Sequence, residues 1–282
     1  MPGLWMPMAT FTVLYLLLAG VVCWAMGRRK EASSMDNRWE HLLVPLGMGR
    51  VYTRIGGCSS GPPVVLVHGF VLAGDYMMPT AEMLARFSRT YVPDLPGYGL
   101  SGPPGQPLDL RFLSDSLAEW MERLNLRHAH FVGNSFGCQV LVDFAARHSR
   151  FVQRLVLQGP TVDPAARSMV KQVIRLMNNS RIESPGLGTL MLRDYWRAGW
   201  RGILATVRMA LRDRQESKLP HISAPTLVVR GSRDVLAPQN WAEQMVRLLP
   251  DGHLLVLPGL AHTIIYTAPA LFVDAIRPFL RM

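Results

Sequence analysis

The chain has 282 residues, of which 49% are hydrophobic, and it carries 30 Lys and Arg against 20 Asp and Glu for a formal net charge of +10. An apolar fraction of this size supplies a core and excludes an intrinsically disordered chain. Three cysteines are too few for a disulfide framework, which suits a reducing compartment. The sequence has no internal repeat and no low-complexity stretch.

The N-terminal segment has no charged side chain from Met1 to Gly27. Residues 8–26 are mostly apolar, and these nineteen positions would form a helix of about 28 Å, enough to cross the hydrocarbon core of a bilayer. The basic run Arg28–Lys30 follows directly, and basic residues favour the cytoplasmic side of a membrane. The pattern predicts a single-pass membrane anchor with a basic flank over residues 1–30, a linker over residues 31–40 and a cytoplasmic catalytic domain.

Two alternatives remain open for this segment. Ala25-Met26-Gly27 offers the small residues of a signal-peptidase site, and cleavage there would release a secreted or periplasmic protein. A signal peptide has its basic residues before the apolar run, whereas here they follow it, which favours the anchor. Translation from Met35 would instead delete the apolar segment.

Five short apolar runs predict strands of a buried parallel sheet, because strands covered on both faces read as continuous hydrophobic stretches. They cover residues 63–67, 130–132, 154–158, 225–230 and 253–257. The first runs into His68-Gly69-Phe70, whose loop can turn a backbone N–H toward a reacting group. The carboxyl ends of parallel strands lie at one edge of a sheet, so the loops after these strands are expected to meet there.

Residues 133–137 read G-x-S-x-G, with an apolar strand before them and an amphipathic segment after them. This pattern predicts a sharp strand-to-helix turn with Ser135 at its apex, where glycines let the neighbouring backbones approach. The turn exposes the Ser135 hydroxyl and aims the N–H of Phe136 at the same point. It indicates a nucleophile beside an oxyanion donor.

Asp234 and His262 come just after the last two predicted strands. A serine hydroxyl is a weak nucleophile, and a histidine within hydrogen-bond reach takes its proton as attack proceeds. A carboxylate then fixes the tautomer of the histidine and stabilises the imidazolium. The pattern therefore predicts a Ser135–His262–Asp234 triad at one sheet edge.

Residues 161–220 lie between the predicted strands at 154–158 and 225–230 and carry eleven Lys or Arg against five Asp or Glu. Helices are expected over residues 165–178, 187–198 and 200–214. If these helices cover the serine, Met169, Tyr195 and Trp196 are expected in the substrate pocket. The rest of its apolar roof is expected from Val173, Leu176, Met177, Leu190 and Met191.

The order Ser…Asp…His on these strand ends resembles the α/β-hydrolase fold, and Asp94–Ser101 is similar to the D-x-x-G-x-G-x-S segment of many members. The resemblance covers roughly residues 40–282. It implies an α/β protein with a mostly parallel eight-stranded sheet flanked by helices. The catalytic domain would occupy residues 41–282, with residues 161–220 as the cap and Asp94 as an organiser of its loop.

Within this fold, the chain resembles the serine esterases and lipases. Its overall organisation is similar to that of membrane-anchored, monoacylglycerol-lipase-like members. It implies hydrolysis of carboxylic esters through an acyl-enzyme on Ser135, with His262 as general base and Asp234 orienting it. The backbone N–H groups of Phe70 and Phe136 would form the oxyanion hole. A lipid ester such as a monoacylglycerol is the expected substrate.

Three alternatives stay open at this point. Asp163, after the sixth strand, could replace Asp234 as the acid, as in some members of the fold. Gly-Asn-Ser-Phe-Gly also resembles the elbow of C–C bond hydrolases of ring-fission diketones, for which Arg175, Arg193 or Arg197 would bind a substrate carboxylate. The third alternative is a non-catalytic binding protein on the same fold.

No cofactor is implied, because the chain has no zinc-ligand spacing, no phosphate-binding loop and no dinucleotide fingerprint. The basic excess of the cap lacks any nucleic-acid recognition motif, so anionic lipid headgroups are the favoured partner and nucleic acid is not expected. The sequence leaves the oligomeric state open.

Overall fold

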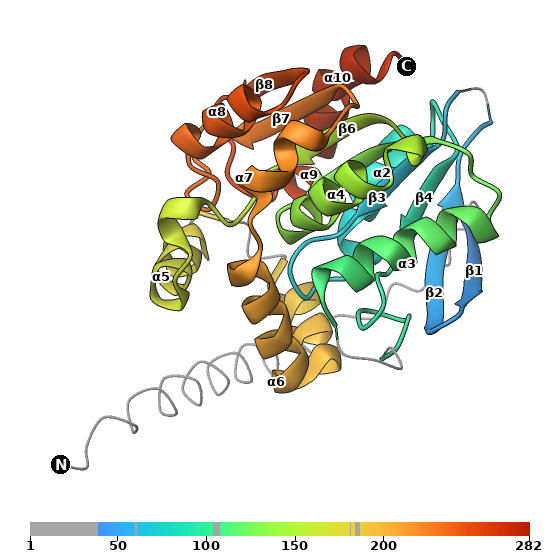
Figure 1. The fold of residues 1–282 in the computed structure, drawn as a ribbon, viewed down its shortest axis with the longest axis horizontal. Coiled ribbons are helices and arrows are strands. Elements are labelled where there is room, and N and C mark those ends of the chain that lie inside the picture. The colour runs from blue at the N-terminus through green and yellow to red at the C-terminus, as the bar shows by residue number, and fades with distance from the viewer. Residues whose placement is uncertain (1–38, 60, 104–107, 181, 184–186) are drawn as a thin grey trace.

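The computed structural model describes residues 39–282 except for residues 60, 104–107, 181 and 184–186 (Figure 1). The predicted anchor lies outside the described residues. Within the part that is described, no helix has both the length and the apolarity to cross a membrane. The first strand begins at Trp39, so the last two residues of the predicted linker belong to the sheet.

Eight strands form one sheet in the order β1-β2-β4-β3-β5-β6-β7-β8. β2 runs antiparallel to both of its neighbours, and every other pair is parallel, which confirms the predicted mostly parallel sheet. The strands are β1 (Trp39–Leu46), β2 (Gly49–Gly56), β3 (Val64–Val67), β4 (Thr90–Pro93), β5 (Ala129–Asn134), β6 (Val152–Gln158), β7 (Thr226–Gly231) and β8 (Gly252–Leu257).

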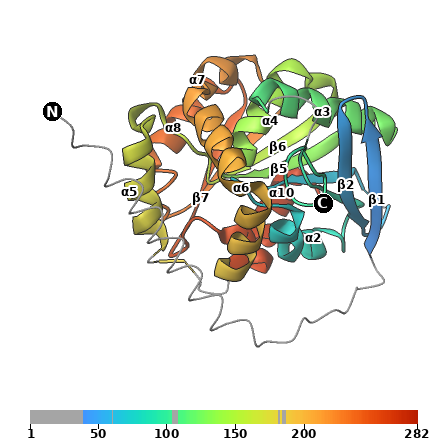
Figure 2. The same ribbon diagram turned by 90° about the horizontal axis from the view of Figure 1, so that it is seen from below.

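Helices cover both faces of the sheet, as Figure 2 shows. One face packs against α3 (Leu110–Arg123), α4 (Phe136–Arg147) and α8 (Gln239–Leu248), and the other against α2 (Met78–Leu84), α9 (Ile264–Thr267) and α10 (Pro269–Leu280). The short helix α7 (Gln215–Lys218) contacts α4. In β3, Val65 and Val67 enter the first core, whereas Val64 and Leu66 enter the second. Because a strand alternates its side chains, burial on both faces requires the continuous apolar run seen in the sequence.

The cap follows β6 and contains α5 (Met169–Ser180) and α6 (Gly188–Arg212). These helices lie between β6 and β7, within the range expected for the insertion. Gly199 has φ 63° and ψ 168°, which interrupts α6 near the predicted boundary between two helices. The cap lies beyond the carboxyl ends of the parallel strands, where the loops after β5, β7 and β8 converge (Figures 1 and 2).

Candidate active site

Ser135 occupies the turn between β5 and α4 with φ 54° and ψ −118°. A non-glycine residue in this region is strained by roughly 1–3 kcal/mol, and such strain persists only where the surroundings hold it. The N–H of Ser135 donates to the carbonyl of Gln158 at 3.0 Å, and its carbonyl accepts from Cys138 N–H at 3.0 Å. A Cβ on Gly137 would lie 2.5 Å from the carbonyl oxygens of Val67 and His68, so this position needs glycine for the close approach to β3.

Cys138, three residues after the serine, is not a competing nucleophile. Its side chain is completely buried, and its thiol donates to the carbonyls of Gly133 at 3.3 Å and Gln158 at 3.4 Å. Burial raises the pKa of this thiol well above its usual value, so it stays protonated at neutral pH.

Asp234 and His262 meet beyond the ends of β7 and β8. Oδ2 of Asp234 lies 2.8 Å from Nδ1 of His262, and both side chains are buried. Oδ1 of Asp234 accepts the backbone N–H groups of Leu236 and Ala237, each at 2.9 Å. The carboxylate is therefore held by its own loop and presents its second oxygen to the imidazole.

The pKa values of this pair shift in opposite directions. Burial by itself would lower the pKa of His262, but the adjacent Asp234 charge and hydrogen bond, with Glu183, raise it above the usual value. Burial would raise the pKa of Asp234, but His262 and the two backbone donors lower it. Asp234 thus stays ionised and stabilises a protonated His262.

The polypeptide around His262 is fixed by the neighbouring strands. Nε2 of Gln158 donates to the carbonyl of His262 at 2.9 Å, while Oε1 of Gln158 accepts from Nδ2 of Asn134 at 2.6 Å. This chain joins the strand before Ser135 to the loop that carries His262. Gly159 has φ 58°, and a Cβ there would lie 2.8 Å from the imidazole, so any larger residue would displace the ring.

Nε2 of His262 is buried and has no hydrogen-bond partner among the described residues. The hydroxyl of Ser135 lies 3.3 Å from that of Thr161, in the loop after β6. In this state the serine is paired with a threonine, and the free nitrogen of the histidine is available to accept a proton. Thr161 is a site residue that the sequence analysis missed, because no local pattern marks it.

The loop after β3 is organised by buried polar side chains. Nε2 of His68 accepts the N–H of Leu95 at 3.0 Å, and its Nδ1 lies 3.1 Å from the carbonyl of Gly69. Burial lowers the pKa of His68, which keeps this ring neutral and structural. Phe136 is the first residue of α4, so its N–H has no acceptor one turn earlier in the helix.

The carboxylate of Asp94 fixes the loop after β3 by accepting hydrogen bonds. Its Oδ1 receives the Gly74 N–H and the Arg54 guanidinium, each at 2.7 Å, and its Oδ2 receives the Leu100 N–H at 2.8 Å. Arg54 also pairs with Asp75 at 2.5 Å. Asp94 therefore ties its own loop to the segment that follows Phe70.

The cap touches this loop through α6. The ring of Tyr195 packs edge-on against Phe70, with centroids 6.3 Å apart. Oδ2 of Asp194 accepts the backbone N–H of Ala73 at 3.1 Å, and Arg193 pairs with Asp75 at 2.8 Å. Asp194 was also missed by the sequence analysis, since its partner lies 121 residues earlier in the chain.

Part of the predicted apolar roof is wrong. Trp196 is 86% exposed and faces solvent, because it lies on the opposite side of α6 from Asp194 and its contacts. The predicted α5 residues are also largely outside the core, with Met169 at 36% and Met177 at 57% exposure. Leu190, Met191 and Tyr195 of α6 are instead partly buried and pack against the core cluster that contains Tyr76 and Ile264.

Asp163, the alternative acid, is engaged elsewhere. It is buried and forms an ion pair with Arg175 of α5, whereas the imidazole of His262 is bonded to Asp234. Among the residues that the structure describes, no group of three His, Cys, Asp or Glu side chains is arranged to hold a metal ion.

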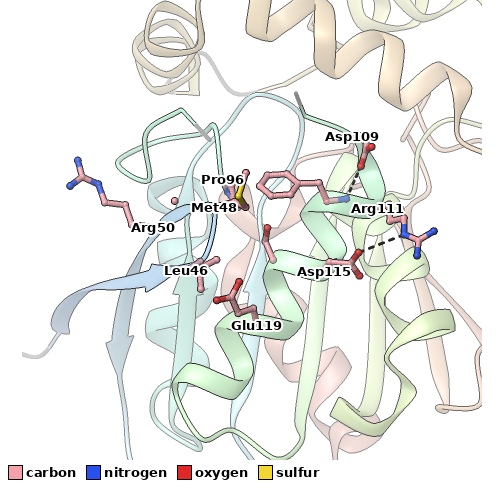
Figure 3. A pocket seen from close by; sticks show the side chains of 11 residues that line it. Leu46, Met48, Arg50, Pro96, Asp109, Arg111, Asp115 and Glu119 are labelled. Atoms are coloured by element: carbon pink, nitrogen blue, oxygen red, sulfur yellow. Dashed lines mark hydrogen bonds and ion pairs between the residues drawn. The ribbon is translucent and has the colours of Figure 1, made fainter. Parts of the chain in front are cut away.

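A surface groove of about 300 Å³ lies away from these residues, at the start of α3 (Figure 3). Its carboxylates already have partners. Asp109 caps α3 through the N–H of Phe112, Asp115 pairs with Arg147, and Glu119 accepts the N–H of Gly47. These carboxylates therefore hold α3 and its neighbours in place.

Residues 64–275 match the model of the Alpha/beta hydrolase family, and the chain belongs to this family. A 2-hydroxy-6-oxo-2,4-heptadienoate hydrolase from Pseudomonas putida is 25% identical over 258 residues, covering 82% of this chain and 94% of that protein. The dihydrolipoyllysine-residue acetyltransferase component of the acetoin cleaving system of the same species is 27% identical over 227 residues, but these cover 74% of this chain and only 60% of that protein.

Solved structures show the same fold. A thermophilic esterase from Thermogutta terrifontis is similar with a TM-score of 0.71 and 26% identity, covering 86% of this chain and 98% of the esterase. A bacterial membrane phospholipase A is similar with a TM-score of 0.76 and 22% identity, covering 97% of each chain. The chain is thus a hydrolase of the α/β-hydrolase superfamily with esterases among its structural neighbours.

Proposed function

We propose that this protein is a serine hydrolase of carboxylic esters, with Ser135 as nucleophile, His262 as general base and Asp234 as the group that orients it. The observation that carries the proposal is the buried Asp234–His262 pair at 2.8 Å, with Nε2 of the histidine left without a partner among the described residues. This nitrogen and the strained Ser135 elbow belong to loops at the same edge of the sheet.

The proposed reaction begins when Ser135 leaves Thr161 and transfers its proton to Nε2 of His262. The serine oxygen attacks the ester carbonyl, and the backbone N–H groups of Phe70 and Phe136 bind the oxyanion. His262 then gives its proton to the leaving alcohol, and an acyl-enzyme forms. Water, activated by the same histidine, releases the acid and restores the serine.

The C–C hydrolase alternative has support from the Pseudomonas putida relative. It requires a basic side chain of the cap that is available to a substrate carboxylate. Two of the three candidates are already paired with protein acids: Arg175 with Asp163, and Arg193 with Asp75 and Asp194. Arg197, the third candidate, is exposed at the surface, and together with the two pairs this favours a neutral ester as the substrate.

A lipid ester is the substrate class that we favour. The apolar residues 8–26 and the basic run after them support a membrane anchor with the catalytic domain on the cytoplasmic side. Exposed apolar side chains of the cap offer a second contact with lipid, since Val170 of α5 is 67% exposed and Trp200 of α6 is 70% exposed. Extraction of membranes at alkaline pH and protease protection would test anchoring and orientation.

The decisive experiment uses the full chain in detergent, with p-nitrophenyl esters from acetate to palmitate and a fluorophosphonate probe. We expect Ser135→Ala to abolish both labelling and turnover, and Asp234→Asn to lower kcat by about 10⁴-fold because the histidine tautomer is no longer fixed. A ring-fission dienoate is the counter-substrate. Cleavage of the dienoate without ester turnover would reject the ester assignment, and unchanged turnover in Ser135→Ala would reject the serine mechanism.

The pH dependence follows from the pKa of His262, which is raised above its usual 6.5. The base must be neutral to accept the serine proton, so kcat/KM is expected to fall as the pH drops through this raised pKa. Asp234 has a lowered pKa and stays ionised across that range.

A further inference from the structure

Glu183 belongs to the cap, between α5 and α6, yet its carboxylate lies on the loop that carries His262. Oε1 accepts the backbone N–H groups of His262 at 2.9 Å and Thr263 at 3.0 Å, and Oε2 accepts the Thr263 hydroxyl. Nδ2 of Asn179, near the end of α5, donates to the same carboxylate at 3.2 Å. Hydrogen bonds to an ionised acceptor are roughly twice as strong as neutral ones, so this is a firm contact between the cap and the loop.

Three separate parts of the chain thus fix His262. Asp234, after β7, holds the imidazole, and Gln158, at the end of β6, holds the carbonyl. Glu183 accepts the backbone N–H of His262, and among these three residues Glu183 is the one that belongs to the cap. Asp234 and Gln158 reach His262 from the ends of sheet strands, whereas Glu183 reaches it from the cap.

The charge of Glu183 also acts on the imidazole. The ionisable groups that face His262 are Asp234 and Glu183, and both raise its pKa against the lowering effect of burial. Tyr76 lies in the field of both carboxylates, and burial, with their charges, raises its pKa well above its usual value, so it remains neutral. Removal of the Glu183 charge therefore destabilises the imidazolium and lowers the pKa of His262.

We propose that Glu183 is a positioning residue for His262, which ties the placement of the catalytic imidazole to the seating of the cap. The proposal rests on the proposed function in one respect, namely that His262 is the general base. Binding of a substrate that moves the cap would change the position of the base through this contact.

Glu183→Gln is the sharpest variant, because the amide keeps the size of the side chain and one acceptor oxygen but removes the charge. Glu216→Gln is the matched control. Glu216 is another carboxylate of the same insertion, paired with Arg167 and not with the His262 loop. The direct measurement is an NMR titration of the full chain, with isotope-labelled histidine, in detergent. His262 is assigned from the resonance that disappears in His262→Gln.

We expect Glu183→Gln to lower the pKa of His262 by about 0.5 to 1 unit, and Glu216→Gln to leave it unchanged. The acid limb of kcat/KM for p-nitrophenyl butyrate should move by the same amount in the same direction. Thr263→Val, which keeps the charge but loses the hydroxyl contact, should lower kcat by about threefold to tenfold without moving the pKa.

The proposal is overturned if Glu183→Gln moves the His262 pKa no further than Glu216→Gln does. Since the NMR titration needs no turnover, it decides the role of Glu183 even where no ester is hydrolysed. Absence of ester turnover in the wild type would count against the proposed function alone. A shift of the pKa together with retained fluorophosphonate labelling of Ser135 supports both.

Discussion

The two helices of the cap are both amphipathic, but they differ in how they contact the rest of the molecule. α6 is bonded to the body of the domain at several points along its length. Asp194 binds Ala73 N–H at 3.1 Å, Thr206 lies 2.8 Å from the hydroxyl of Tyr98, and the carbonyl of Ala210 accepts from Gln139 at 3.1 Å. These contacts reach the loop after β3, the loop after β4 and helix α4.

α5 is attached mainly to its own neighbourhood. Arg175 pairs with Asp163, and Lys171 donates to the carbonyl of Ala165 at 2.7 Å. Its apolar residues point outward, with Val173 at 46% and Ile174 at 53% exposure. Both helices are amphipathic, so amphipathicity did not determine which face turned inward. The orientation of α6 follows its buried polar contacts with the domain. These contacts place α6 against the site, whereas α5 presents an apolar surface to solvent.

Among variants that test the difference between α5 and α6, Asp194→Ala is expected to cause the largest loss of stability and activity. The change leaves the buried N–H of Ala73 without its acceptor and Arg193 without its 2.9 Å partner, which should cost about 2 kcal/mol of unfolding free energy. Because the loop after β3 then loses its contact with α6, we expect kcat for p-nitrophenyl butyrate to fall by at least about tenfold. Urea denaturation and steady-state kinetics measure the two effects.

Asp194→Asn is the matched control for this variant. The amide oxygen can still accept from Ala73 N–H, so activity should stay closer to that of the wild type. Equal losses in the alanine and asparagine variants would show that the charge, and not the backbone contact, holds the loop.

A smaller effect is expected from Tyr195→Leu, which removes the ring that packs edge-on against Phe70. Edge-on aromatic pairs contribute about 1 kcal/mol beyond their burial, which corresponds to roughly a fivefold change in kcat/KM. Tyr195→Phe keeps the ring and should lose less. If leucine and phenylalanine behaved alike, the aromatic contact would have no part in placing the loop after β3.

The sheet and the positions of the predicted catalytic residues could be derived from the sequence. Ser135, Asp234 and His262 follow strands whose apolar runs are continuous, and the ends of parallel strands converge by geometry alone. Which residues of the cap helices turn toward the domain could not be derived, because Met169 and Trp196 lie in helical patterns like those of Leu190 and Tyr195. An amphipathic pattern gives the apolar face of a helix but not what covers it.

Thr161, Glu183 and Asp194 were missed for a related reason. Each acts on a partner that is distant in the sequence: Ser135 for Thr161, the His262 loop for Glu183 and Ala73 for Asp194. Nothing in the residues next to them distinguishes these side chains from surface ones. Positioning contacts of this kind become visible only when the cap is placed on the domain.

The smallest change in stability is expected on the outer face of α5, in the double variant Val173→Ser/Ile174→Ser. Both side chains are about half exposed, so the free energy of unfolding should change by no more than about 0.5 kcal/mol for each. Turnover of the soluble acetate ester should be unchanged. If this face meets lipid, hydrolysis of a palmitate ester presented in anionic vesicles should fall several-fold, since less apolar area is buried at the interface. The ratio of the two rates is the measurement, and Glu82→Gln, at an exposed position of α2, is a surface control outside the cap. A ratio that stays at the wild-type value would mean that α5 has no role in lipid contact and that its exposed apolar side chains are ordinary surface.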